Sequence, residues 1–188
     1  AYMGSLDAWL TAVGFTIWGS QVWVMRLVQI ILYSLTIIVS ILIGRVAFRT
    51  WTHGLLAGVF LAFPAVNTTL YTTISLGGYG EALLIGSLGL LVGFWMLQQE
   101  NLRRLYWMGI WGGLLGLGLW ANGLSLVFFL PMGMALLLRV IRLKPLKRMG
   151  FSLLAGLVGF TIGSAPWWVY AIQNGFGHLI GEMGGTAV

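Results

Sequence analysis

Residues 22–44 read VWVMRLVQIILYSLTIIVSILIG. This apolar run contains one charged residue, Arg26, and is followed by Arg45. A helix needs about 20 such residues to cross the roughly 30 Å of hydrocarbon in a bilayer. The run therefore predicts a transmembrane helix. The whole chain agrees with this, because 59% of its 188 residues are hydrophobic and only 7% are charged, whereas about a quarter of the residues in a soluble domain are charged.

Further apolar stretches continue the same pattern. Residues 55–70, 82–97 and 151–171 each predict one more span. Residues 105–138 would form a helix of about 51 Å, which is too long for one crossing. Basic clusters flank both ends of this stretch, so it predicts two short helices with a turn at Asn122-Gly123. The count is about six spans.

The first residues predict a different kind of helix. Residues 5–17 are too few to span, but Leu6, Leu10, Val13 and Ile17 follow helical spacing. This indicates a helix that lies at the outer membrane interface or packs beneath it. The predicted fold is all-α, a polytopic transmembrane helical bundle of about six spans plus an N-terminal interfacial helix, in one domain over residues 1–188.

Lysine and arginine collect on one side of this topology. Nine of the ten lie in the loops at 45–53, 98–104 and 139–149, and only Arg26 falls on the other side. Basic loops stay cytoplasmic, so both ends of the sequence are expected to be extracytoplasmic, in an integral membrane protein. The positive charge then sets topology, and no nucleic-acid partner is expected. The sequence opens and stops within loops, which predicts a fragment.

Several kinds of site are excluded or disfavoured. The chain has no cysteine, which excludes thiolate catalysis and disulfides. Its two histidines, His53 and His178, are too far apart in sequence to suggest a metal site. His178 and Glu182 stand four apart, but the glycines around them favour a loop over a metal site. Asn67 begins a glycosylation sequon, which has meaning only in some hosts. No metal ligand set is predicted.

Glu81 is the first candidate functional residue. It heads the predicted span 82–97 and follows the glycine-rich bend Gly77-Gly78-Tyr79-Gly80, where the backbone can approach a ligand closely. A carboxylate near the outer membrane boundary can act chemically. It can equally stabilise the helix by interacting with the dipole at its N-terminus, and the residues alone leave both interpretations open.

Arg26 and Asp7 are the other candidates. Arg26 stands four residues into a span, where a charge is costly unless it is paired. It either extends to the lipid headgroups or binds a phosphate. Asp7 either begins the interfacial helix as a first-turn acid or contributes to a site. Gly112-Gly113, Gly116 and Gly118 indicate tight helix packing in the fourth span.

The order of these features resembles a known superfamily. The stretches Tyr2-Met3-Gly4-Ser5-Leu6-Asp7-Ala8, Gly78-Tyr79-Gly80-Glu81-Ala82 and Gly163-Ser164-Ala165-Pro166-Trp167 are similar to glycosyltransferase C enzymes. The nearest branch looks like the bacterial dolichyl-phosphate-mannose-protein mannosyltransferase-like and aminoarabinose-transferase-like proteins. The resemblance covers nearly the whole chain.

The resemblance implies transfer of a sugar from a polyprenyl-phosphate donor to a glycan, lipid or protein acceptor at the outer face of a bacterial plasma membrane. In the resemblance Glu81 matches the second external acid, which positions the acceptor or an ion, and Arg26 would bind the donor phosphate. The reaction also needs a carboxylate at the membrane boundary, so Glu81 and Asp7 are the predicted catalytic residues. In the family the principal acid follows a first transmembrane helix, which would lie upstream of Ala1, so the fragment alone is expected to be inactive. No cofactor is specified, and a divalent cation stays open.

Two other classes of function compete with this one. A transporter or flippase would use an intramembrane arginine and a boundary glutamate to bind a moving solute or to couple to protons, although no inverted repeat is evident. A purely structural membrane subunit is the third class. An enzyme needs a lipid-linked sugar donor, whereas a transporter moves solute in sealed vesicles.

Overall fold

The computed structural model describes residues 6–63, 78–98, 104–143 and 146–177. In these ranges the chain is helical and contains no strand, which confirms the predicted all-α class. The α-helices and one 3-10 helix, η1, are α1 (Leu6–Trp18), α2 (Val22–Phe48), α3 (Trp51–Ala62), α5 (Tyr79–Gln98), α6 (Arg104–Ala121), η1 (Gly123–Ser125), α7 (Leu126–Leu143), α8 (Leu146–Gly163) and α9 (Ala165–Asn174).

Two helices in the described part of the chain are long and apolar enough to cross a membrane, α2 and α5. A third crossing is added if α8 and α9 count as one broken span. The span predicted over 151–171 is not one continuous helix, because α8 ends at Gly163 and α9 leaves it at 60°. Pro166 lies in the first turn of α9, where its missing N–H costs nothing, whereas inside a continuous helix it would break the hydrogen-bond ladder.

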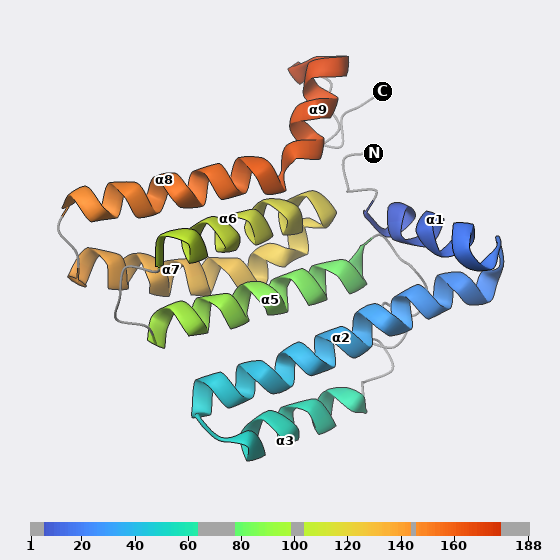
Figure 1. Ribbon diagram of the computed structural model, residues 1–188, viewed down its shortest axis with the longest axis horizontal. Coiled ribbons are helices and arrows are strands. Elements are labelled where there is room, and N and C mark those ends of the chain that lie inside the picture. Colours follow the sequence, from blue (N-terminus) through green and yellow to red (C-terminus); the bar gives the residue numbers. More distant parts are fainter. Residues whose placement is uncertain (1–5, 64–77, 99–103, 144–145, 178–188) are drawn as a thin grey trace.

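From α2 to α8, consecutive α-helices run in opposite directions (Figure 1). Gly44 near the end of α2 packs on Gly54 near the start of α3, and the Tyr33 hydroxyl, earlier in α2, donates to the Leu61 carbonyl at 2.7 Å. The start of α5 likewise lies beside the end of α6, where Gly78 approaches Ala121. In contrast, α2 and α5 run parallel, as do α6 and α8.

This alternation separates the charges along the bundle. Arg45 and Arg49 stand where α2 ends, and Gln98 at the end of α5 donates to the Val46 carbonyl at this same end of the bundle. Asp7 and Glu81 stand at the other end, in the first turns of α1 and α5. The described acids and most described bases therefore lie at opposite ends, as the hydropathy and charge patterns predict.

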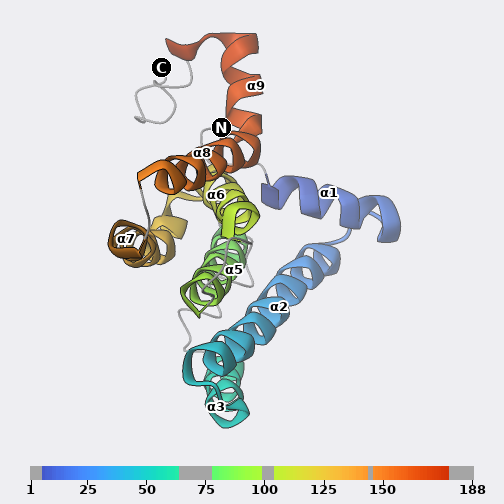
Figure 2. The ribbon, with the colours of Figure 1, turned by 60° about the vertical axis from the view of Figure 1, so that its left-hand side comes forward.

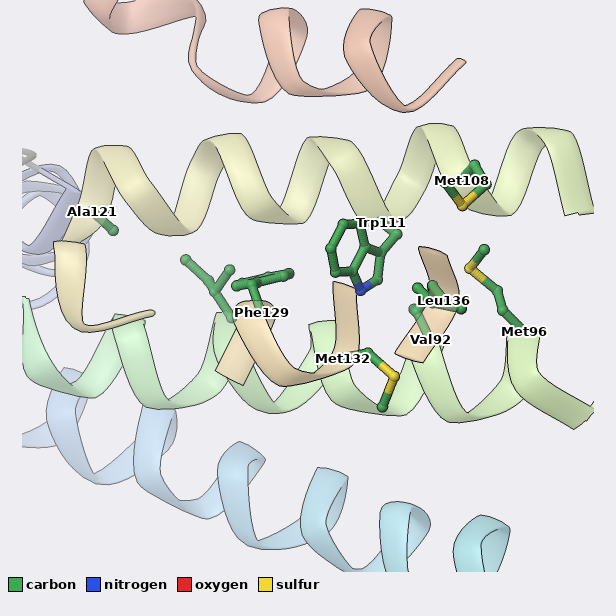
Figure 3. Close-up of a cluster of buried hydrophobic side chains, with 9 residues drawn as sticks. Val92, Met96, Met108, Trp111, Ala121, Phe129, Met132 and Leu136 are labelled. Atoms are coloured by element: carbon green, nitrogen blue, oxygen red, sulfur yellow. The ribbon is translucent and has the colours of Figure 1, made fainter. Parts of the chain in front are cut away.

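The core lies between α5, α6 and α7 (Figure 3). The Trp111 indole donates to the Gly89 carbonyl at 3.1 Å and meets the Phe129 ring edge-on at 5.3 Å. Gly89 and Gly93 leave room on α5 for Phe129 and Met132. A buried indole needs a partner for its N–H, and the Gly89 carbonyl supplies one without a polar side chain in the apolar core.

A second contact, between α6 and α8, is made by glycines on both helices. Added Cβ atoms at Gly112 and Gly116 would overlap backbone atoms of α8, and one at Gly159 would overlap the backbone of Gly109. The prediction that Gly112-Gly113 and Gly116 mark tight helix packing is confirmed. Gly118 instead faces Ser125, in the short turn that follows α6.

The turn between α6 and α7 falls where the sequence predicts it. Asn122 interrupts the helix, and its side-chain oxygen accepts a hydrogen bond from the Leu124 amide at 2.9 Å. Since α6 contains 18 residues, it is about 27 Å long. The long apolar stretch is thus two antiparallel helices of near-membrane length.

The predicted N-terminal helix is confirmed as α1, which lies across the start of α2 (Figures 1 and 2). Thr11 and Gly14 are buried on its inner face, one and two turns after Asp7. Val13 and Ile17 are exposed on its outer face. One face of α1 therefore belongs to the bundle, and the other presents apolar side chains to the surroundings.

Candidate functional site

Glu81 is the most deeply buried acid in the described part of the chain. It lies in the first turn of α5, as predicted, and is only 1% exposed. Its carboxyl group stands close to that of Asp7 and to its own backbone amide. Neither carboxyl oxygen, however, meets hydrogen-bond geometry with a partner in the structure described. A buried polar group of this kind is costly, so packing alone gives no reason for a glutamate here.

Asp7 and Gln29 complete a polar cluster around Glu81. The Gln29 amide donates from Nε2 to Oδ1 of Asp7 at 2.7 Å, and Gln29 is only 2% exposed. The three side chains come from α5, α1 and α2, and two of the helices that carry them, α2 and α5, are candidate membrane spans. The structure therefore brings together the two acids that the sequence predicts as site residues.

Two glycines of the bend allow these helices to approach. A Cβ at Gly80 would come within 2.6 Å of the Gln29 side-chain oxygen. Gly78 has φ +82°, and a Cβ there would lie 2.9 Å from the Ala121 carbonyl oxygen. The sequence suggested that this bend admits a ligand. In the structure the space beside Gly78 and Gly80 is filled by α6 and α2 respectively.

Arg26 does not join the cluster. It lies one turn before Gln29 on α2 but is exposed, and in the structure as described it forms no ion pair with Asp7 or Glu81. Its position agrees with extension to headgroups and leaves it accessible to a phosphate that approaches from the lipid.

The remaining sequence candidates lie elsewhere. His178, Glu182 and Asn67 fall outside the described residues. His53 lies at the far end of the bundle, where it hydrogen-bonds to Thr50 and stacks on Phe48 at 4.9 Å. Over the described ranges no three metal-ligating side chains come together.

Gln29 is the site residue that sequence reasoning missed. One signal was available, because a glutamine inside an apolar span is expected to find a partner on another helix. Thr36, on the same helix, shows the contrast: it is also buried, but its hydroxyl donates to the Leu32 carbonyl of its own helix at 2.9 Å. Polarity alone therefore does not reveal which residue links helices.

Comparison of the chain with models of protein families, with curated proteins and with solved structures finds no match. The resemblance to glycosyltransferase C enzymes consequently stays a prediction from the sequence motifs.

Proposed function

We propose that this chain is part of a membrane glycosyltransferase that moves a sugar from a polyprenyl-phosphate donor to an acceptor at the extracytoplasmic face. The observation that carries the proposal is Glu81, buried with both carboxyl oxygens lacking hydrogen-bond partners in the described structure and standing beside Asp7. Such an arrangement is expensive for stability and useful for acid–base chemistry.

In the proposed reaction the acceptor hydroxyl attacks the anomeric carbon of the sugar. The new bond from this oxygen to carbon forms as the bond from carbon to the phosphate oxygen breaks, and the polyprenyl phosphate leaves. Glu81 takes the hydroxyl proton as general base, and Asp7 orients the acceptor. Exclusion of water around Glu81 strengthens its interaction with the hydroxyl. Arg26 stabilises the charge on the departing phosphate.

The proposal includes a topology of about six crossings in the bacterial plasma membrane. Its support is the alternating direction of α2, α3, α5, α6, α7 and α8, together with Arg45 and Arg49 at one end of the bundle and the two acids at the other. Because basic residues favour the cytoplasm, the acids are assigned to the outer face, where a lipid-linked donor would present its sugar.

The direct test uses the complete gene product in liposomes. Polyprenyl-phosphate donors that carry a radiolabelled hexose or pentose are added, with membranes from cells that lack the gene as the source of acceptor. We expect label to move to the acceptor and free polyprenyl phosphate to appear. Failure of every donor to react would overturn the enzymatic proposal.

A proton-coupled transporter is the second candidate, because a buried, unpartnered carboxyl group in a helical bundle also suits a carrier that binds and releases a proton. Sealed vesicles separate the two functions. A transporter would move labelled free sugar or protons across the membrane without breaking a glycosidic bond, whereas the enzyme would release polyprenyl phosphate in leaky and sealed vesicles alike.

Arg26 gives a specific prediction. Arg26→Gln is expected to raise the KM for the polyprenyl-phosphate donor about tenfold and to leave the KM for the acceptor unchanged, because it removes a charged hydrogen bond to phosphate. Arg45→Gln is the control: Arg45 lies over the Trp51 ring, 3.9 Å from its centroid, at the opposite end of the bundle. Equal changes in both KM values for Arg26→Gln would contradict the phosphate role.

A further inference from the structure

Gln29 occupies an unusual place for a residue of a candidate membrane span. Its amide is buried between α1 and α5: Nε2 donates to Asp7 on one side, and Oε1 faces the Gly80 backbone on the other. A hydrogen bond from an amide to a carboxylate is stronger than a neutral one, and more so where water is excluded. This contact ties the first turn of α1 to the bundle.

The rest of α1 has a limited hold on α2. Gly14 fits against Val24 and Val28, since a Cβ added to Gly14 would lie 2.8 Å from Val24 Cγ1 and 3.4 Å from Val28 Cγ2. The outer stripe, Val13 and Ile17, is exposed. Near Asp7, Leu6 packs against the core and Thr11 is buried. The end of α1 that carries Asp7 is therefore held by this packing together with the hydrogen bond from Gln29.

We infer that Gln29 is a positioning residue, which holds α1 on the bundle so that the Asp7 carboxyl group stays beside Glu81. The effect of Gln29 on catalysis rests on the proposed function. The docking of α1 on the bundle can be tested independently of that function. The buried Gln29 amide donates to Asp7, so its loss is expected to act by displacing the Asp7 carboxyl group.

The first experiment measures docking alone. The 188 residues contain no cysteine, so the pair Gly14→Cys and Val24→Cys reports on α1, because these positions are at a separation that a disulfide can bridge. Gln29→Met keeps the length of the side chain and removes the amide. In the complete gene product we expect Gln29→Met to slow disulfide formation about tenfold, by loss of a charged hydrogen bond. An unchanged rate would overturn the inference.

Thr36→Val is the matched control on the same helix. Thr36 is buried, but its hydroxyl bonds only within α2, so its removal is expected to leave the rate of disulfide formation as it was. If Thr36→Val slows the reaction as much as Gln29→Met does, the effect comes from α2 as a whole, and the positioning role of Gln29 is contradicted.

The second experiment connects docking to transfer. Gln29→Met is expected to lower kcat about tenfold with little change in the donor KM, and the 14–24 disulfide is expected to restore kcat because it holds α1 without the amide. If the disulfide abolishes transfer when Gln29 is intact, α1 has to leave the site during turnover, and positioning is the wrong role. If no variant transfers sugar, including the unmodified protein, the proposed function fails while the disulfide rates still decide whether Gln29 docks α1.

Discussion

Glu81→Gln is expected to lower sugar transfer by a factor of about 100 to 10,000, the usual contribution of a general acid or base. The substitution keeps the shape of the side chain and removes its ability to accept a proton. Stability is expected to stay the same or to rise, because the glutamate is 1% exposed and neither oxygen has a hydrogen-bond partner in the described structure, so little is lost and a buried charge is avoided. Transfer rates and the melting temperature in detergent are the two measurements.

Ser87→Ala serves as the control for this prediction. Ser87 is also buried on α5, nearly two turns beyond Glu81, and it has no role in the proposed reaction. It should retain full transfer. Opposite behaviour of Glu81→Gln, with full transfer and a lower melting temperature, would mean that Glu81 stabilises the N-terminus of α5 and does no chemistry.

Helix ends and turns could largely be predicted, because they depend on local residues. The start of α2 at Val22 agrees with the apolar run, and the turn at Asn122 follows from the ability of asparagine to bond to nearby backbone amides. The α2 helix runs past Gly44 to Phe48, since an arginine such as Arg45 can lie at a helix end with its charge outside the apolar layer. Hydropathy does not detect this extension.

The bend between α8 and α9 was not predicted, although Pro166 is a local signal for a helix break. Residues 151–171 are apolar throughout except for a few small polar side chains, and apolarity is the same for a straight span and for a bent one. At the bend the Ser164 hydroxyl donates to the Phe160 carbonyl at 2.7 Å and accepts from the Trp168 indole at 3.0 Å. These contacts exist only once the two helices have formed.

Two residues of the candidate site, Glu81 and Asp7, could be predicted from the sequence, but their contact could not. Glu81 and Asp7 stand out as rare charges in an apolar chain, so each could be chosen singly. Their meeting depends on how α1 crosses the ends of α2 and α5, which is tertiary packing. Gln29 went unnoticed because its importance lies in its contact with Asp7, and no local pattern encodes that contact.

Gly159→Ala is expected to destabilise the bundle by about 3 kcal/mol, the upper part of the range for overpacked cores. The added Cβ would overlap the carbonyl of Gly109, which is backbone and cannot rotate away. The two helices would have to separate, so their other close contacts, such as Gly112 with Gly156, would be lost together. Thermal unfolding in detergent measures the effect, and α6 and α8 are expected to lose protection from hydrogen exchange first.

The glycines of the contact between α6 and α8 do not all have the same room for a Cβ, so different substitutions are expected to have different effects. A Cβ at Gly109 would lie 3.5 Å from the Ala155 carbonyl oxygen, an ordinary contact, and one at Gly150 on α8 would meet nothing within 4 Å. Gly109→Ala and Gly150→Ala should therefore keep the melting temperature or raise it slightly, because alanine favours the helix over glycine by about 1 kcal/mol. If Gly109→Ala were as harmful as Gly159→Ala, α6 and α8 would have to pack in a different register. Because α6 also lines the core with Trp111, that register shift would move the Gly89 contact as well.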